Sequence, residues 1–167
     1  MLYLKELNYD DIDAEYNTIK TFLPDENGFE NKYYNVSKEE FEKQVIPKLI
    51  KMSKGEELPE GYVPETYFFL WNDDEIVGLF KIRHYLNGAL EKGAGHIGYG
   101  ILPKYRGKGF AKQGLQLAIE KCKEIISEKE IYLSVHKDNP ISLSVQKSCS
   151  AYIVGENEKE YLTRIKI

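Results

Sequence analysis

The alternation of apolar and polar residues predicts several short strands. Residues 2–7 alternate well enough to form the first strand. Residues 66–71 are rich in the aromatic side chains that favour strands, and residues 75–85 follow a polar turn as the second arm of a hairpin. The remaining predicted strands cover residues 96–102, 131–135, 151–155 and 161–167.

Apolar residues at helical spacing predict four helices between these strands. The first begins near residues 10–11 and ends before Pro24, because proline cannot continue a helix. A capping box of Ser37 and Glu40 opens the second, and Pro47 predicts a kink or a break within it. The third helix carries an apolar stripe of Leu115, Ala118, Ile119, Cys122 and Ile125, and the fourth begins near Asn139.

The predicted elements follow the order β-α-α-β-β-β-α-β-α-β-β, which indicates an α/β protein with a mixed sheet. The segments 25–35, 54–64 and 87–95 are polar or rich in glycine and proline, and we expect them to be loops. The chain has 167 residues and neither a repeat nor an evident domain boundary, so residues 1–167 are expected to form a single domain.

Composition narrows the classes of function. Hydrophobic residues make up 42% of the chain and charged residues 30%, as in an ordinary globular protein. The net charge of −4 argues against general nucleic-acid binding, and no apolar run approaches the ~18 residues of a membrane span. Residues 1–6 lack the basic start of a signal peptide, and the two cysteines have no metal-ligand spacing. We therefore expect a cytoplasmic protein without a metal site or a membrane partner.

The turn after the strand 96–102 is the most informative segment for function. Gly107 and Gly109 let the backbone approach a ligand without a Cβ in the way. The first turn of the following helix offers unpaired N–H groups and the positive end of the helix dipole. Further positive charge comes from Arg106, Lys108 and Lys112. Such a site suits a pyrophosphate, although a simple strand-to-helix turn with solvated lysines is the alternative.

The residues of this turn resemble a known motif. The Walker spacing and the dinucleotide-binding glycine pattern are both absent. The pattern R-x-x-G-x-A at Arg106, Gly109 and Ala111, with Pro103 before it, is similar to the acyl-CoA motif of the GNAT superfamily of N-acetyltransferases.

A second motif follows in the order that this superfamily has. Asn139, with Ser142 three residues later, follows the strand 131–135 and resembles the start of the helix beside the pantetheine arm of CoA. The resemblance covers residues 66–155. It implies a single-domain, mixed and mostly antiparallel sheet with helices on both faces. In that fold the strands 96–102 and 131–135 would splay apart and admit the pantetheine arm.

The resemblance also implies roles for individual residues. Backbone groups of Tyr99 and Ile101 would bind the pantetheine or the acetyl carbonyl of acetyl-CoA, the co-substrate. Asn139 and Ser142 would contact the arm, and a helix N-cap is a compatible alternative for Asn139. The residues implied to hold the pyrophosphate are Arg106, Gly107, Lys108, Gly109, Phe110, Ala111 and Lys112.

The catalytic groups are specified less completely. His96 occupies a position where many members carry a glutamate, and its imidazole could take the proton from the amine. The alternative for His96 is a partly buried strand histidine bonded to backbone. Weaker candidates are His84, Tyr85, Ser134 and His136. Where many members have a tyrosine that protonates the thiolate, this chain has Gln146. Protonation by solvent, protonation by another tyrosine, and slow catalysis are the alternatives.

The loop 25–35 is expected to roof the acceptor cleft, as the corresponding segment does in GNAT members. Its acidic and aromatic residues, Asp25, Glu26, Phe29, Glu30, Tyr33 and Tyr34, suit a cationic amine, although an ordinary solvated loop is the alternative. We therefore expect an N-acetyltransferase that moves an acetyl group from acetyl-CoA to a primary amine of a small molecule or peptide. A catalytically weak acyl-CoA-binding sensor or interaction module is the alternative. The acceptor and the oligomeric state stay open, with a homodimer among the options.

Overall fold

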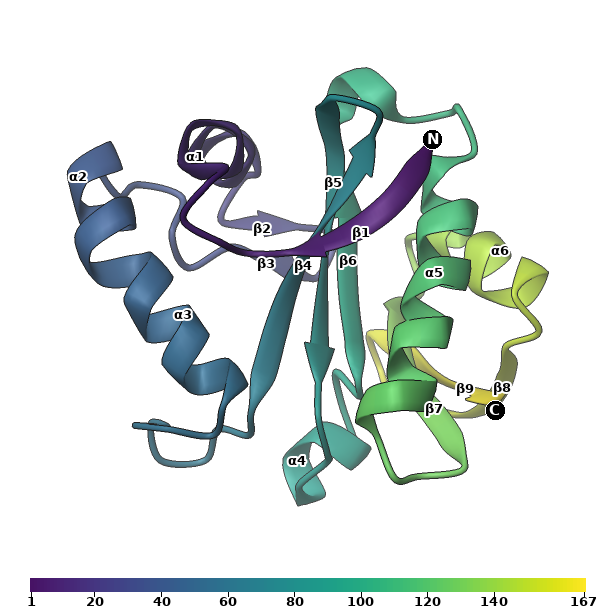
Figure 1. The fold of residues 1–167 in the computed structure, drawn as a ribbon. Helices are drawn as coiled ribbons and strands as arrows, with labels where there is room; N and C mark the ends of the chain where they lie inside the picture. The colour runs from purple at the N-terminus through teal and green to yellow at the C-terminus, as the bar shows by residue number, and fades with distance from the viewer.

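Two antiparallel sheets form the frame of the computed structural model, which describes residues 1–167. One sheet contains β1 (Leu2–Glu6), β4 (Glu65–Asn72), β5 (Glu75–Arg83) and β6 (Ile97–Ile101), and the other contains β7 (Glu130–His136), β8 (Tyr152–Glu156) and β9 (Glu160–Lys166). The longer helices are α1 (Ile12–Thr21), α3 (Ile46–Ser53), α5 (Phe110–Ile125) and α6 (Pro140–Ser148). Figure 1 shows α1 and α3 on one side of the first sheet and α5 with α6 on the other, which confirms the predicted α/β arrangement.

Strands β6 and β7 belong to different sheets and meet at one end only. The first sheet has the order β1-β4-β5-β6 and the second the order β7-β9-β8. At the start of β6, Gly95 bridges Leu133, and the N–H of His96 donates to the carbonyl of Tyr132 (2.7 Å). Beyond this tie the two strands share no ladder. The predicted splay between these strands is therefore confirmed.

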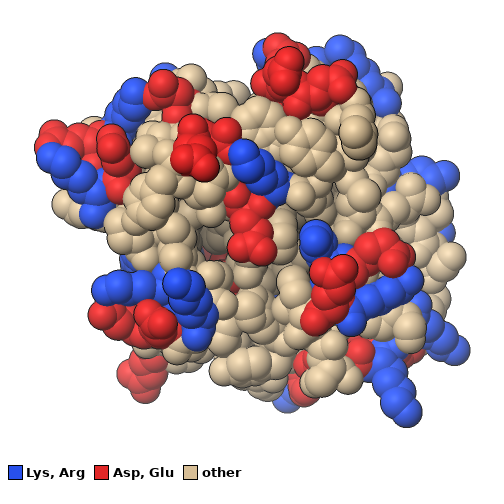
Figure 2. Space-filling model, viewed as in Figure 1, with Lys and Arg blue, Asp and Glu red and all other residues tan.

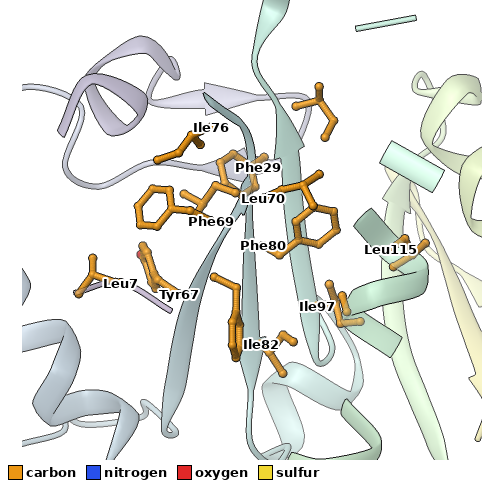
Figure 3. Close-up of a cluster of buried hydrophobic side chains, with 14 of the residues drawn as sticks. Leu7, Phe29, Tyr67, Phe69, Leu70, Ile76, Phe80, Ile82, Ile97 and Leu115 are labelled. Carbon is orange, nitrogen blue, oxygen red and sulfur yellow. The ribbon is translucent and has the colours of Figure 1, made fainter. Parts of the chain in front are cut away.

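Alternation within β4 and β5 builds the two faces of the first sheet. Leu70 and Phe80 face α5, where a Cβ placed on Gly114 would lie only 2.5 Å from the Phe80 ring. Only glycine fits at this approach of helix to sheet. On the opposite face, Tyr67 and Phe69 point toward the side of α3 (Figure 3). Burial of a side chain such as Phe80 contributes about 2–3 kcal/mol.

The helical segment after residue 37 is broken, as Pro47 predicts. Ser37 Oγ accepts the N–H of Glu40 (3.1 Å), which confirms the predicted cap. The segment then runs through α2 (Lys38–Glu40), a π-turn η1 (Phe41–Val45) and α3, with Pro47 in the first turn of α3. Because proline has no N–H, it cannot complete the preceding helical ladder, and the wider turn takes up the mismatch.

Two segments expected to be loops contain regular structure. Residues 25–30 form a hairpin of β2 (Asp25–Glu26) and β3 (Phe29–Glu30) around Asn27 and Gly28, which both have positive φ. An Asn-Gly pair favours this kind of tight turn, so the sequence did contain the signal. Residues Gly88–Glu91 form the short helix α4, with Asn87 as its N-cap. The structure contains no helix that combines a membrane-spanning length with sufficient hydrophobicity.

Candidate functional site

A cleft of about 500 Å³ lies between the β2–β3 hairpin and the gap that separates β6 from β7. Its floor includes Tyr67 of β4, Lys81 of β5 and Gly98 of β6, which are neighbours in the sheet register. The hairpin supplies one wall, and Ser134 and His136 of β7 supply another. On the face drawn in Figure 2, acidic and basic side chains are intermixed in small groups. Neither sign of charge forms a continuous field on this face.

The register of β5 and β6 leaves one edge of β6 unpaired. The N–H of Arg83 donates to the carbonyl of His96 (2.8 Å), and the N–H of Leu102 donates to the carbonyl of Val77 (2.9 Å). Because bonded positions alternate in an antiparallel ladder, the even-numbered residues of β6 direct their backbone groups to β5. The residues that turn their backbone groups into the gap are therefore Ile97, Tyr99 and Ile101.

Strand β7 presents a matching edge on the other side of the gap. The N–H of Lys137 donates to the carbonyl of Lys159 (2.8 Å), and the N–H of Ile167 donates to the carbonyl of Lys129 (3.1 Å). The odd-numbered residues of β7 therefore face β9. The residues on the gap side are therefore Tyr132, Ser134 and His136. Tyr132 is bonded to His96, and the carbonyls of Ser134 and His136 accept from Gln146 and Asn139, so the N–H groups of Ser134 and His136 are what β7 leaves free. The edge of β6 can bind an extended ligand with amide groups as it would bind an added strand.

The glycine turn lies at the open end of this gap, outside the lining of the cleft. Gly107 (φ 75°) and Gly109 (φ 81°) both adopt the left-handed region. Gly109 directly precedes α5, and no side chain caps this helix, so the N–H groups of its first turn are free to bind an anion. Arg106 Nε donates to the carbonyl of Ile101 (2.9 Å), and its guanidinium contacts the carboxylate of Glu26.

The side chain of Tyr99 reaches α6. Its hydroxyl lies 3.0 Å from Ser142 Oγ, and its ring stacks on Phe80 with centroids 5.3 Å apart. Asn139 Oδ1 accepts the N–H of Ser142 (3.2 Å), so its predicted alternative role as a helix N-cap is confirmed. Burial raises the pKa of Tyr99, and the phenol therefore stays protonated at neutral pH. Tyr99, Asn139 and Ser142 all line the cleft.

The position of His96 does not suit the predicted role of general base. The side chain is fully buried and does not line the cleft. Its Nδ1 accepts the N–H of Tyr132 (2.9 Å), so in the neutral ring the proton sits on Nε2, which lies 3.4 Å from the Glu128 carboxylate. Burial also lowers the pKa of His96. With its one lone pair occupied, the imidazole ties β6 to β7, and we revise its assignment to a structural one.

Gln146 lies on the buried side of α6, and both polar atoms of its side chain form hydrogen bonds. Its Nε2 donates to the carbonyl of Ser134 (3.2 Å), and its Oε1 accepts the hydroxyl of Thr163 (2.6 Å). The amide thereby fastens α6 to the edge of β7. The hydroxyl of Tyr99 reaches the same helix at Ser142 (3.0 Å). The structure therefore brings another tyrosine to the helix on which the sequence lacks one.

A cluster of polar groups borders the gap at the end of β7. Glu160 Oε1 accepts the hydroxyl of Ser134 (3.2 Å) and lies 3.8 Å from His136 Nε2. The tip of the hairpin covers this imidazole, because a Cβ on Gly28 would lie 2.6 Å from His136 Nε2. His136 is thus the histidine that lines the cleft. No group of three or more His, Cys, Asp or Glu side chains is arranged to hold a metal ion.

Lys81 is a feature of the cleft that the sequence analysis missed. The residue is only 8% exposed, and its Nζ donates to the carbonyl of Glu30. The ammonium lies 4.7 Å from the Phe29 ring centroid and 5.2 Å from that of Tyr67. Burial lowers the pKa of Lys81 to about 8. A lysine at an inward position of a strand that is otherwise apolar, as in residues 75–85, was the available signal.

Comparisons with known proteins agree with this geometry. The model of the acetyltransferase (GNAT) family matches residues 30–149. No curated protein matches the chain significantly. A spermidine N-acetyltransferase from Vibrio cholerae, in complex with CoA and spermine, is 20% identical with a TM-score of 0.66, over 99% of this chain and 95% of its own. The N-acetyltransferase PseH of Campylobacter jejuni, in complex with acetyl coenzyme A, is 16% identical with a TM-score of 0.63, over 99% of each chain. At these identities the two structures establish similarity of fold.

Proposed function

The chain belongs to the GNAT acetyltransferase family, and on that premise we propose that it transfers the acetyl group of acetyl-CoA to a primary amine of a small molecule or peptide. Residues 1–167 would act as one acetyltransferase domain. The observation that carries the proposal is the free edge of β6 at Ile97 and Tyr99, which lies between the glycine turn and the cleft where β6 parts from β7.

The proposed donor site uses both ends of this gap. The pyrophosphate of acetyl-CoA would bind the free N–H groups at the start of α5, where Gly107 and Gly109 keep the backbone accessible. The pantetheine amides would pair with the exposed backbone of Tyr99 and Ile101. The reactive thioester would then lie beside the Tyr99 hydroxyl, at the inner end of the gap.

The proposed chemistry needs two proton transfers. The amine nitrogen attacks the acetyl carbonyl carbon, the carbon–sulfur bond breaks, and its electron pair goes to sulfur. Tyr99 would donate its phenolic proton to that sulfur, since it is the protonated hydroxyl at the gap. His136, beside Glu160, would accept the proton that the amine releases and return it to the phenolate through solvent. The products are the acetylated amine and CoA with a free thiol.

Release of free thiol from acetyl-CoA, measured with a panel of amines and with mass spectrometry of the acetylated product, tests this proposal. We expect thiol release that depends on the amine and on the intact glycine turn. Gly109→Asp should weaken acetyl-CoA binding at least about 30-fold, or ~2 kcal/mol, because it adds a side chain and a like charge beside the pyrophosphate. Lys123→Met, on the exposed side of α5, is the matched control.

Two outcomes would contradict the proposal in different ways. If the protein binds acetyl-CoA tightly but releases no CoA thiol in the presence of any amine, the acyl-CoA-binding module is favoured instead. Unchanged acetyl-CoA affinity in a folded Gly109→Asp protein would remove the glycine turn from the donor site.

A further inference from the structure

Lys81 places a positive charge on the floor of the cleft without a carboxylate to neutralise it. Its Nζ has three protons to donate, and the carbonyl of Glu30 accepts one of them. The residue forms no ion pair, although it is nine-tenths buried. The aromatic faces of Phe29 and Tyr67 favour a cation but supply no counter-charge. A buried ammonium in this position is stabilised by a ligand that brings a negative charge.

None of the acidic residues that line the cleft forms an ion pair with Lys81; they are Asp25, Glu26, Glu30, Glu65 and Glu160. Glu65, on the same face of the sheet, forms an ion pair with Arg83 (3.2 Å). Glu26 pairs with Arg106, and the side chain of Glu30 is exposed while its carbonyl accepts from Lys81. The acidic hairpin, which suggested a cationic acceptor from the sequence, therefore leaves the ammonium of Lys81 without a paired carboxylate.

Space for a ligand group lies directly beside this ammonium. Gly98 faces Lys81 across the β5–β6 register, and a Cβ built on Gly98 would meet no atom within 4 Å. Neighbouring strands lie about 4.8 Å apart, so a group bound to Lys81 is only a few bonds from the gap edge of β6. The proposed thioester would lie at that edge, next to Tyr99.

We infer that the acceptor is a primary amine that carries a carboxylate a few bonds from its nitrogen, and that Lys81 binds this carboxylate. The inference rests on the proposed function, because it names the acceptor of the same reaction. Lys81 would fix the acceptor at one end while the amine points into the gap. A diamine of the same length would place a second ammonium against Lys81 and lose affinity through like-charge repulsion.

Acceptors of equal length and different charge test this inference directly. The measurement is kcat/KM with acetyl-CoA for γ-aminobutyrate, butylamine and putrescine, followed by α-amino acids and their amides. We expect at least one carboxylated amine to exceed its neutral or cationic counterpart by tenfold or more, which corresponds to ~1.4 kcal/mol. Comparison of the α-amino acids with γ-aminobutyrate shows which spacing between amine and carboxylate the site prefers.

Substitution of Lys81 tests whether its charge causes the preference for carboxylated amines. Lys81→Met keeps the buried apolar stem and should remove the preference by raising KM for the carboxylated amine, so that the ratio of its kcat/KM to that of butylamine falls to about one. Lys81→Arg should retain part of the preference. Thermal unfolding of each variant establishes that it is folded.

A carboxylate preference that survives Lys81→Met in a folded protein, or a preference for putrescine, would overturn this inference and leave the proposed acetyl transfer intact. Absence of transfer to every amine, butylamine included, would overturn both.

Discussion

The hydroxyl of Tyr99 lies 3.0 Å from Ser142 Oγ. Strand β6 of the first sheet therefore contacts helix α6 at the gap between β6 and β7. This contact places a protonated phenol against α6, the helix on which related sequences led us to expect a tyrosine. In the proposed mechanism β6 therefore supplies the proton donor instead of α6.

Replacement of this phenol tests its role. We expect Tyr99→Phe to lower kcat by about 10²-fold, the lower range for a lost general acid, with acetyl-CoA affinity nearly unchanged. The ring would keep its stacking on Phe80, so only the proton is lost. Steady-state kinetics and calorimetry with acetyl-CoA measure the two effects. Tyr105→Phe, whose hydroxyl bonds to Glu75 away from the gap, is the control.

A second substitution separates proton donation from packing. If a phenol on α6 can replace the one on β6, Gln146→Tyr in the Tyr99→Phe background should restore kcat by about tenfold or more. In the parent protein the same change should give no gain in kcat and should lower thermal stability, because it removes the buried hydrogen bonds of Gln146 to Ser134 and Thr163. A near-normal kcat in the Tyr99→Phe protein would show that solvent, and not Tyr99, protonates the CoA thiolate.

Gly98 offers a way to close the acceptor side of the cleft without damaging the fold. A Cβ at this position would meet no atom within 4 Å and needs no unusual backbone, so Gly98→Val should fold normally while filling the space beside Lys81. We expect KM for the acceptor to rise about tenfold or more and the affinity for acetyl-CoA to change little. Gly100→Val is the contrasting variant, because its Cβ would lie 2.9 Å from Phe22, and it should lower thermal stability. An unchanged acceptor KM in Gly98→Val would place the acceptor elsewhere.

The two histidines near the gap should respond differently to substitution. His136→Ala should lower kcat/KM by about 10²-fold, because this imidazole lines the cleft. His96→Ala should lower the free energy of unfolding by about 2–4 kcal/mol, as loss of a buried side chain does, with kcat/KM of the folded protein changed by less than about threefold. A loss of kcat/KM of about 10²-fold in a folded His96→Ala protein would reinstate His96 as the base.

Glu15 of α1 should make stability depend on pH. The side chain is fully buried, Oε1 accepts the N–H of Asn8 (3.0 Å), and Oε2 has no partner. Burial raises the pKa of Glu15 to about 8, while in the unfolded chain the carboxyl titrates near ~4.3. The folded protein therefore holds a proton that the unfolded chain has lost. The contribution of the protonated Glu15 carboxyl to the free energy of unfolding is fully present at about pH 4 and is lost as pH rises through about 8.

Substitution of this carboxyl should flatten the pH dependence. We expect Glu15→Gln to raise the free energy of unfolding at about pH 8 by a few kcal/mol, measured by urea denaturation across pH, with little change at acid pH. Glu42→Gln, on an exposed site, should leave the profile unchanged. An unaltered slope in Glu15→Gln would show that the carboxyl is ionised in the folded protein.

Local chemistry explains why parts of the site were readable from sequence. Gly107 and Gly109 were readable because a residue without a Cβ leaves the backbone open to a ligand, and in the structure both also adopt the positive φ that glycine tolerates. Asn139 was recognised as a cap because its position before a proline fixes the start of α6. The apolar stripe of α5 is buried at Leu115, Ala118 and Cys122.

The parts that sequence missed depend on contacts between distant segments. Alternation along β6 cannot reveal that His96 is sealed against Tyr132 and Glu128, because the bridge at Gly95 is made with a strand some 40 residues away. The isolation of Lys81 likewise depends on which nearby carboxylates are already paired, and those pairs form only in the folded chain. The sequence therefore predicted a cationic acceptor from the acidic residues of the hairpin, because nothing in it showed that Lys81 would be buried and without an ion pair.

β6 and β7 are tied together near His96, so the angle between their two sheets determines how far apart the strands lie at Ile101. Strands rise about 3.3 Å per residue, so roughly 16 Å of β6 separates His96 from Ile101, and a change of ~5° in that angle would alter the separation at Ile101 by more than ~1 Å. A displacement of that size is enough to cost a reaction about 10²-fold in rate. We therefore expect a substitution of Glu128, which lies beside His96, to change the width of a gap that Glu128 itself does not line.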